Sequence, residues 1–151
     1  EGGHVIGNHA MNHEKMLFMK REAVLAEIDN AQNAIAGACG AEPLHFRPPY
    51  GVFDFTTARA ARDRGMEMVL WTVLSGDYST SSETEILKRV RSFIRAGSIM
   101  VFHDTAGGGG RALPDILKQI GAAAEEQGLR LGGVDELSKS DEITMGDEHA
   151  G

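Results

Sequence analysis

Short apolar runs alternate along this chain with amphipathic segments, and this alternation is the feature that most restricts its possible folds. Helices of roughly 10 to 15 residues between strands are typical of α/β domains with a largely parallel sheet. We therefore expect an α/β fold. The predicted strands are 44–46, 66–74, 98–102 and 129–131, and the predicted helices are 20–36, 55–64, 82–97 and 113–126.

Two of these segments show the patterns most clearly. The run at 66–74, MEMVLWTVL, is nearly continuous in apolar residues, as expected of a strand that is buried on both faces. The segment 20–36 has apolar residues at helical spacing, namely Val24, Ile28, Ala31 and Ile35. Its acidic residues are assigned to the other faces of the helix, and they are Glu22, Glu27 and Asp29. Gly37 and Gly40 are expected to end it.

Composition excludes several classes of partner. From a chain of 151 residues with 42% hydrophobic content we expect one domain with a proper core. The net charge of −7 argues against a nucleic-acid partner, because no basic stripe exists to displace phosphate counterions. The longest apolar runs are too short to span a bilayer. Cys39 is the single cysteine, so no internal disulfide is possible.

The stretch GGHVIGNHAMNH at 2–13 carries the first candidate site. His9 and His13 are four residues apart, and imidazoles at i and i+4 project to the same side of a helical turn, where both can reach one divalent ion. The pair is a weak signal by itself, because six histidines in the chain produce such spacings by chance. A polar helical turn without an ion is the alternative interpretation.

Further polar residues follow predicted strands. The Arg47–Tyr50 turn, Asp77 and His103 each come just after one, and the histidine pair follows a short apolar run that ends in Gly7-Asn8. The carboxyl ends of parallel strands share one face, where active sites are built. Taken alone, the Arg47–Tyr50 segment is a stiff turn and Asp77 an ordinary turn residue. A functional role is better supported for His103, because burying polar groups without partners at the end of a strand costs free energy.

Four segments in this order, GHVIGNHAMNH, FRPPYG, VLWTVLSGDYS and IMVFHD, resemble the NodB-like polysaccharide deacetylases (carbohydrate esterase family 4). The resemblance extends from about Gly3 to Leu137, and the set of four is specific. It implies a distorted (β/α) barrel and a hydrolase that removes N-acetyl groups from a chitin-like or peptidoglycan-like polysaccharide or oligosaccharide. It also implies a place in the cell envelope or outside the cell.

The resemblance assigns roles to the first two segments. His9 and His13 would be ligands of a divalent metal, with zinc expected, and Arg47 would hold the catalytic base. The metal would polarise the amide carbonyl and lower the pKa of a water, and the base would complete its deprotonation. The Tyr50 backbone N–H would help to hold the tetrahedral oxyanion.

The last two segments would supply the acid and the substrate groove. By resemblance, His103 is the catalytic histidine and Asp77 its carboxylate partner. A His103 ring kept cationic by Asp77 would protonate the departing amine. Trp71, Tyr78 and Val101 would line the groove and the pocket for the acetyl methyl group.

One part of the family pattern is missing. No Asp-Asp pair occurs in these 151 residues, so the family's base and its third metal ligand are absent. We expect both upstream of residue 1, in a βαβ unit of roughly 30 residues or more. Residues 1–137 are then the C-terminal part of a deacetylase domain, and 138–151 an acidic, disordered tail. Such a fragment is expected to bind metal weakly and to be inactive, and Ala10, where the family usually has Ser or Thr, weakens metal binding further.

Two other functions stay open. A pseudoenzyme that binds sugar or metal without chemistry would fit if the upstream aspartates were lacking. A different metallohydrolase would use the glycine-rich segment 107–110 to cradle a phosphorylated substrate, with Arg111 as the nearby cation. The segment lacks the GxxxxGK[ST] and GxGxxG patterns, which favours a flexible loop instead.

Overall fold

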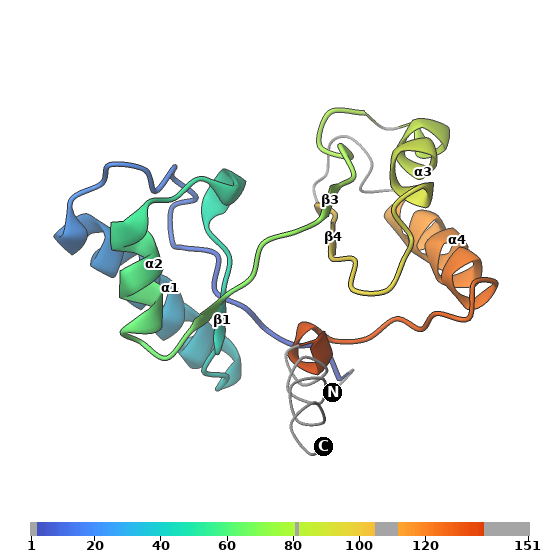
Figure 1. Cartoon of the computed structure of the whole chain (residues 1–151). Helices are drawn as coiled ribbons and strands as arrows, with labels where there is room; N and C mark the ends of the chain where they lie inside the picture. Colours follow the sequence, from blue (N-terminus) through green and yellow to red (C-terminus); the bar gives the residue numbers. More distant parts are fainter. Residues whose placement is uncertain (1–2, 81, 105–111, 138–151) are drawn as a thin grey trace, which may run out of the picture. The chain divides into compact units, whose positions relative to one another are not determined.

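The computed structural model describes residues 3–80, 82–104 and 112–137 of the chain. The chain divides into two compact units, unit 1 over Glu1–Leu70 and unit 2 over Trp71–Gly151. In Figure 1 the colours run from blue to green through unit 1 and from green to red through unit 2. The glycine-rich segment with Arg111 and the predicted tail at 138–151 lie outside the described residues.

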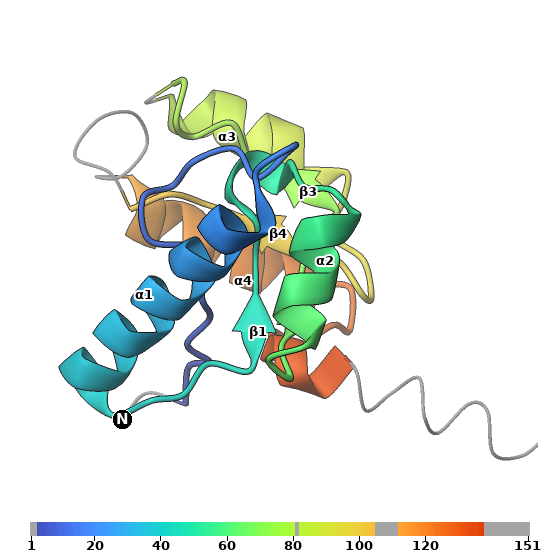
Figure 2. The ribbon, with the colours of Figure 1, turned by 90° about the vertical axis from the view of Figure 1, so that its left-hand side faces the viewer.

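Unit 1 contains two helices packed on a short parallel sheet. Helix α1 (Arg21–Cys39) contacts α2 (Phe55–Arg62), and Figure 2 shows both helices with β1. Strand β1 (His45–Phe46) pairs in parallel with β2 (Glu67–Met68), with Phe46 opposite Met68. The core between these elements consists of Met16, Val24, Ile28, Phe46, Ala60, Ala61 and Met66.

Local sequence explains where the helices of unit 1 begin and end. Helix α1 is as predicted at its start but continues past Gly37 to Cys39. Gly40 ends it in the left-handed conformation (φ 69°), and its N–H donates to the Ala36 carbonyl. Helix α2 begins after Asp54, whose carboxylate accepts the Thr57 N–H at 3.2 Å. It ends at Arg62, two residues before the predicted end.

Unit 2 also contains a two-stranded parallel sheet and two packed helices. Strand β3 (Val73–Leu74) pairs in parallel with β4 (Met100–Val101), and α3 (Glu83–Arg91) packs against α4 (Leu113–Glu125). Its core consists of Val73, Ile86, Leu87, Val90, Ile94, Ile116, Ile120 and Ala124. Each unit therefore has its own apolar core.

The predicted helix starts of unit 2 are confirmed. The Ser82 hydroxyl caps α3 by accepting the Glu85 N–H at 3.4 Å, as the capping pattern indicated. The helix is shorter than predicted, because it ends at Arg91 and not near Gly97, although Ile94 is still buried in the core. Helix α4 covers the predicted segment to within one residue.

The prediction of one strand at 66–74, buried on both faces, is wrong. The run divides into β2 and β3, because its two halves pair with different strands in different units. Between them, the carbonyls of Val69 and Leu70 accept hydrogen bonds from the Arg47 guanidinium at 3.1 and 3.4 Å. Leu70 and Leu74 are 39% and 40% exposed, so the run is not buried throughout.

The predicted last strand at 129–131 is also wrong. These residues are irregular: the Leu129 N–H donates to the Ala124 carbonyl at the end of α4, and Leu131 is 67% exposed. Within the described residues, the sheets have two strands each, so closure into a barrel stays a prediction. No helix in the described part of the chain combines the length and apolar character of a membrane span.

Candidate functional site

The histidine pair of unit 1 lies on a loop, so the expected helical turn is wrong. Residues 9–13 contain no helix, and Ala10 and His13 have left-handed backbones, with φ of 60° and 57°. The loop follows Asn8, which forms an isolated parallel bridge with Phe46 of β1 and whose N–H donates to the His45 carbonyl at 2.8 Å. Hydrogen bonds to the side chains of Asn8 and Glu27, rather than helical bonds, hold the backbone between the two histidines.

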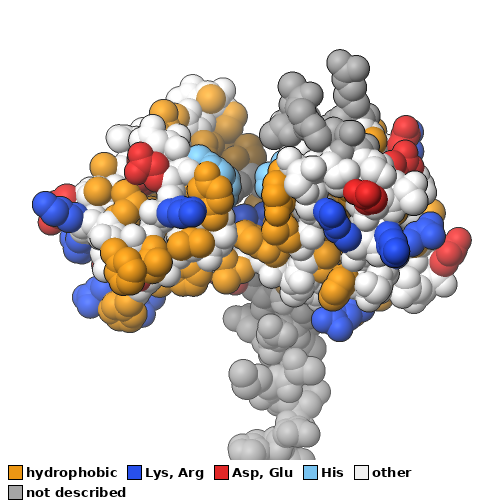
Figure 3. Space-filling model, turned by 90° about the horizontal axis from the view of Figure 1, so that it is seen from above, with side chains coloured by type: hydrophobic (Ala, Val, Ile, Leu, Met, Phe, Trp, Pro, Cys, Tyr) orange, Lys and Arg blue, Asp and Glu red, His pale blue; other side chains and the backbone are white. Residues whose placement is uncertain are grey.

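The two imidazoles nevertheless lie close together. Their ring centroids are 5.0 Å apart in an edge-to-face arrangement, and both side chains are exposed. Histidine side chains reach the surface on the face of the molecule drawn in Figure 3. His9 Nδ1 is 2.7 Å from the Arg47 carbonyl, so Nδ1 carries the proton and the lone pair of the neutral ring is on Nε2. Two imidazoles arranged in this way are suitable ligands for a divalent metal.

Arg47 and Tyr50 belong to the same unit. Tyr50 lies in a 3₁₀ helix, η1 (Pro49–Gly51), with a left-handed backbone at φ 58°, which is strained for a tyrosine. Its ring is 4.7 Å from the His13 ring, and the Lys15 ammonium lies 5.6 Å above it. Burial lowers the pKa of the Arg47 guanidinium, which still stays charged at neutral pH.

In unit 2 the Asp77 carboxylate is bound directly to His103. Asp77 is 1% exposed, and its Oδ1 lies 2.8 Å from His103 Nδ1 while its Oδ2 accepts the His103 backbone N–H at 2.6 Å. The Ser75 hydroxyl donates to the same carboxylate at 2.7 Å. Burial raises the pKa of Asp77, but the hydrogen bonds from His103 and Ser75 outweigh it and hold the pKa below its ordinary value. The carboxylate is therefore ionised at neutral pH.

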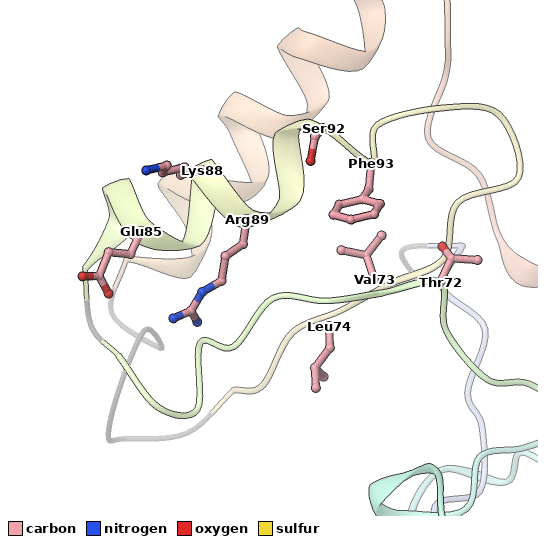
Figure 4. A pocket seen from close by; sticks show the side chains of 8 residues that line it. All are labelled: Thr72, Val73, Leu74, Glu85, Lys88, Arg89, Ser92 and Phe93. Atoms are coloured by element: carbon pink, nitrogen blue, oxygen red, sulfur yellow. The ribbon is translucent and has the colours of Figure 1, made fainter.

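Helix α3 supports the loop that carries Asp77. The Arg89 guanidinium points toward this loop (Figure 4) and lies 3.5 and 3.4 Å from the carbonyls of Ser75 and Gly76. Gly76 has φ +74°, and a Cβ at this position would lie 2.0 Å from Arg89 Nη1. Sequence reasoning did not identify Arg89 or Ser75 as part of the site.

The three predicted groove residues are all in unit 2. Tyr78 is 57% exposed, and its ring lies edge-on to the His103 ring with centroids 5.4 Å apart. Val101 is 8% exposed in β4, and Trp71 is half-buried at the start of the unit. Their roles in a groove stay predictions.

A shallow depression of about 630 Å³ lies elsewhere on unit 2, between α3 and β3 (Figure 4). Its lining contains none of the predicted site residues; it is formed by Thr72, Val73, Leu74, Glu85, Lys88, Arg89, Ser92 and Phe93. Because it is open and lies on the helix side of β3, we do not assign it to the candidate site.

Glu27 was assigned to a polar face of its helix, and this assignment is wrong. The residue is 7% exposed, and its carboxylate binds the loop of the histidine pair. The helical pattern contained the signal, because Glu27 follows Val24 by three residues and precedes Ala31 by four, on the apolar stripe. An acidic residue at such a position needs a buried partner.

The described residues contain no cluster of three or more His, Cys, Asp or Glu side chains that would hold a metal ion. The third ligand of the sequence-based prediction is therefore not among these residues, and the metal role of His9 and His13 stays a prediction. His9, His13, Arg47 and Tyr50 are in unit 1, and Asp77 and His103 are in unit 2.

Comparisons with known proteins agree on one family. Residues 1–69 match the family described as polysaccharide deacetylase. A chitooligosaccharide deacetylase of Bradyrhizobium sp. (strain ANU 289) is 32% identical over 103 residues, which are 68% of this chain and 47% of that protein. A peptidoglycan-N-acetylglucosamine deacetylase of Bacillus cereus is 27% identical over 128 residues, which are 85% of this chain and 46% of that protein. This chain thus spans less than half the length of these two relatives.

Among solved structures, the chain is similar to a pseudoenzyme of carbohydrate esterase family 4 from Bacillus anthracis. The TM-score is 0.76 at 27% identity, and the match covers 87% of this chain and 45% of that one.

Proposed function

Because this chain belongs to the polysaccharide deacetylase family, we propose that it takes part in hydrolytic removal of N-acetyl groups from an amino-sugar polymer. Its relatives are named for chitooligosaccharides and for the N-acetylglucosamine of peptidoglycan, and we assign the same substrate class here. The observation that carries the proposal is the bond between the buried Asp77 carboxylate and His103, at 2.8 Å. A paired, ionised carboxylate prepares a histidine for proton transfer.

Unit 1 would hold a divalent metal, with zinc proposed, through His9 and His13. The bound ion would polarise the acetamide carbonyl and acidify a water. The hydrogen bond between His9 Nδ1 and the Arg47 carbonyl supports this role, because metal-binding histidines donate their other ring N–H to such an acceptor. A carboxylate from outside the described residues would complete the ligand set.

His103 of unit 2 would act as the general acid. As the carbon–nitrogen bond breaks, its ring would give a proton to the departing amine nitrogen. Asp77 would stabilise the imidazolium and fix the ring orientation through Nδ1, so that Nε2 faces the substrate. The ring of Tyr78, edge-on to His103, supports a place for a sugar or acetyl group beside this acid.

Tyr50 and Arg47 would have supporting roles. The Tyr50 N–H would donate to the oxyanion, and the strained backbone at φ 58° supports a functional constraint at this position. Arg47 would hold the catalytic base, and its bonds to the carbonyls of Val69 and Leu70 support a fixed guanidinium.

A second candidate is a non-catalytic carbohydrate- or metal-binding protein of the same fold. One observation favours it: the similar structure from Bacillus anthracis is described as a pseudoenzyme.

Acetate release from chitooligosaccharides distinguishes the two candidates. In the native protein that contains this chain, His103→Ala should lower turnover by about 100-fold or more while bound zinc is retained. His4→Ala, a matched change at an exposed histidine, should leave turnover unaltered. Acetate release that survives His103→Ala would contradict the acid role. A native protein that binds chitooligosaccharide and releases no acetate would favour the second candidate.

A further inference from the structure

Glu27 is a buried acidic residue whose partners all lie between the two histidines. It belongs to α1 and is 7% exposed. Its Oε2 accepts the backbone N–H groups of Met11 at 3.1 Å and Asn12 at 2.8 Å, and its Oε1 accepts the Asn12 side-chain amide. One carboxylate therefore binds three donors from two successive loop residues.

These donors replace the counter-ion that a buried carboxylate usually has. Among the described residues, no Lys, Arg or His forms an ion pair with Glu27. A buried carboxylate is costly unless hydrogen bonds compensate its charge. Two consecutive backbone N–H groups do so strongly and with fixed geometry, because bonds to a charged acceptor are short and directional. The carboxylate and the loop thus fix one another.

The loop is also held on the other side of His9. The Asn8 amide is buried and donates to the Ile28 carbonyl at 3.0 Å, one residue beyond Glu27 on α1. Its oxygen accepts the Ala10 N–H at 3.0 Å. Ala10 and His13 both keep left-handed backbones, which a free loop would relax. Contacts with α1 therefore hold the loop in a conformation that it would not keep alone.

We propose that Glu27 is a positioning residue that fixes the His9–His13 pair in advance of metal binding. The proposal deepens the function proposed above and rests on the metal role assigned to the pair. Glu27 does not touch either ring; it acts on the backbone of Met11 and Asn12, and so sets the distance and direction of the two imidazoles.

The test compares Glu27→Gln with Glu22→Gln in the full 151-residue chain. Glu22 lies on the same helix and is exposed, so it is a matched control. Glutamine keeps the size of the side chain but offers one acceptor atom and adds an amide donor that faces the Asn12 amide. Amide hydrogen exchange in the metal-free protein should become at least about tenfold faster at Met11 and Asn12 in Glu27→Gln, and remain unaltered in Glu22→Gln.

Zinc affinity supplies the second measurement, by competition with a chromophoric chelator. Glu27→Gln should weaken zinc binding about 10- to 100-fold, as loss of a residue that orients metal ligands does, with Glu22→Gln within twofold. Unaltered exchange at Met11 and Asn12 would overturn the proposal. Faster exchange with unaltered zinc affinity would also overturn it, because the role would then be structural only. If the unmodified chain binds no zinc, the metal role falls, and the exchange result alone decides whether Glu27 fixes the loop.

Discussion

The two units each place a buried carboxylate beside exposed or half-exposed histidines, but they use it differently. In unit 1, Glu27 binds the backbone between His9 and His13 and touches neither ring. In unit 2, the Asp77 carboxylate contacts the His103 ring itself, at 2.8 Å. The first arrangement fixes the backbone that carries the two imidazoles. The second fixes the orientation of one ring, which suits a group that transfers a proton.

The two carboxylates also differ in the groups that donate hydrogen bonds to them. Asp77 has His103 and Ser75 as side-chain donors, whereas Glu27 depends on backbone N–H groups and one amide. Removing Asp77 therefore affects a side-chain pair, and removing Glu27 affects a loop conformation. The experiments below separate these effects.

The largest effect on stability is expected from Asp77→Ala. The change leaves the His103 N–H and the Ser75 hydroxyl without their acceptor in a buried place. The free energy of unfolding should fall by about 1–3 kcal/mol, as measured by urea denaturation. Asp104→Ala, at the exposed neighbour of His103, should alter it by less than about 0.5 kcal/mol. Equal effects of the two changes would show that the buried pair has no special role in unit 2.

Gly76→Ala should have the next largest effect. Gly76 and Gly97 both have left-handed backbones, at φ 74° and 76°, so alanine costs about 1 kcal/mol at either position. At Gly97 an added Cβ meets nothing within 4 Å, whereas at Gly76 it would displace Arg89 from the two carbonyls it binds. Gly76→Ala should therefore cost about 1 kcal/mol more than Gly97→Ala by urea denaturation. No difference would mean that α3 does not hold the Asp77 loop.

A smaller effect is expected in the pH dependence of stability. The pKa of Asp77 is lower in the folded protein than its ordinary value of 3.8, so the folded state binds fewer protons than the unfolded state near that pH. The contribution of Asp77 to the free energy of unfolding is present above pH 3.8 and is lost as the pH falls through the lowered pKa. Urea denaturation between pH 2 and 6 should show that the free energy of unfolding falls less steeply toward low pH in Asp77→Asn. An unaltered slope would contradict an ionised Asp77.

A second residue, in unit 1, also contributes to the loss of stability at low pH. Hydrogen bonds from the Arg64 guanidinium lower the pKa of Asp29 in the folded state, so Asp29 contributes with the same sign. Asp29→Asn is therefore the control that shows how much of the acid loss belongs to each unit.

The smallest effect is expected from Lys15→Ala. The Lys15 ammonium lies over the exposed Tyr50 ring, and such exposed contacts contribute about 0.5–1 kcal/mol at most. Loss of a positive charge near His13 should strengthen zinc binding by less than about threefold, because solvent screens the charge. Lys118→Ala in unit 2 is the control, and chelator competition is the measurement. Weaker zinc binding in Lys15→Ala would show that Lys15 shapes the site directly.

Much of the secondary structure was predictable because local chemistry determines it. The capping hydroxyl of Ser82 and the left-handed Gly40 fix helix ends through their own short-range hydrogen bonds. The strand at 66–74 was mispredicted because an apolar run does not show which partner each half will pair with. That choice depends on Phe46 and Val101, which are distant in sequence.

The part of the candidate site that lies at strand ends was predictable from the sequence. Asp77 and His103 follow β3 and β4, and the parallel register of those strands brings the two residues together. The conformation of the histidine loop was not predictable from an i, i+4 spacing, because that spacing also occurs in loops. Its anchor, Glu27, is not predictable from charge, because acidic residues are usually exposed; only its place on the apolar stripe of the helix indicates burial.

The comparison of the two units predicts that a metal binds in unit 1. Side-chain ¹⁵N NMR of the histidines during zinc titration tests this prediction most directly. With one zinc per chain, the Nε2 resonances of His9 and His13 should move to metal-bound positions, while His9 Nδ1 stays protonated and the His103 signals stay unaltered. Zinc-induced change at His103, or none at His9 and His13, would contradict the assignment of metal binding to unit 1 and proton transfer to unit 2.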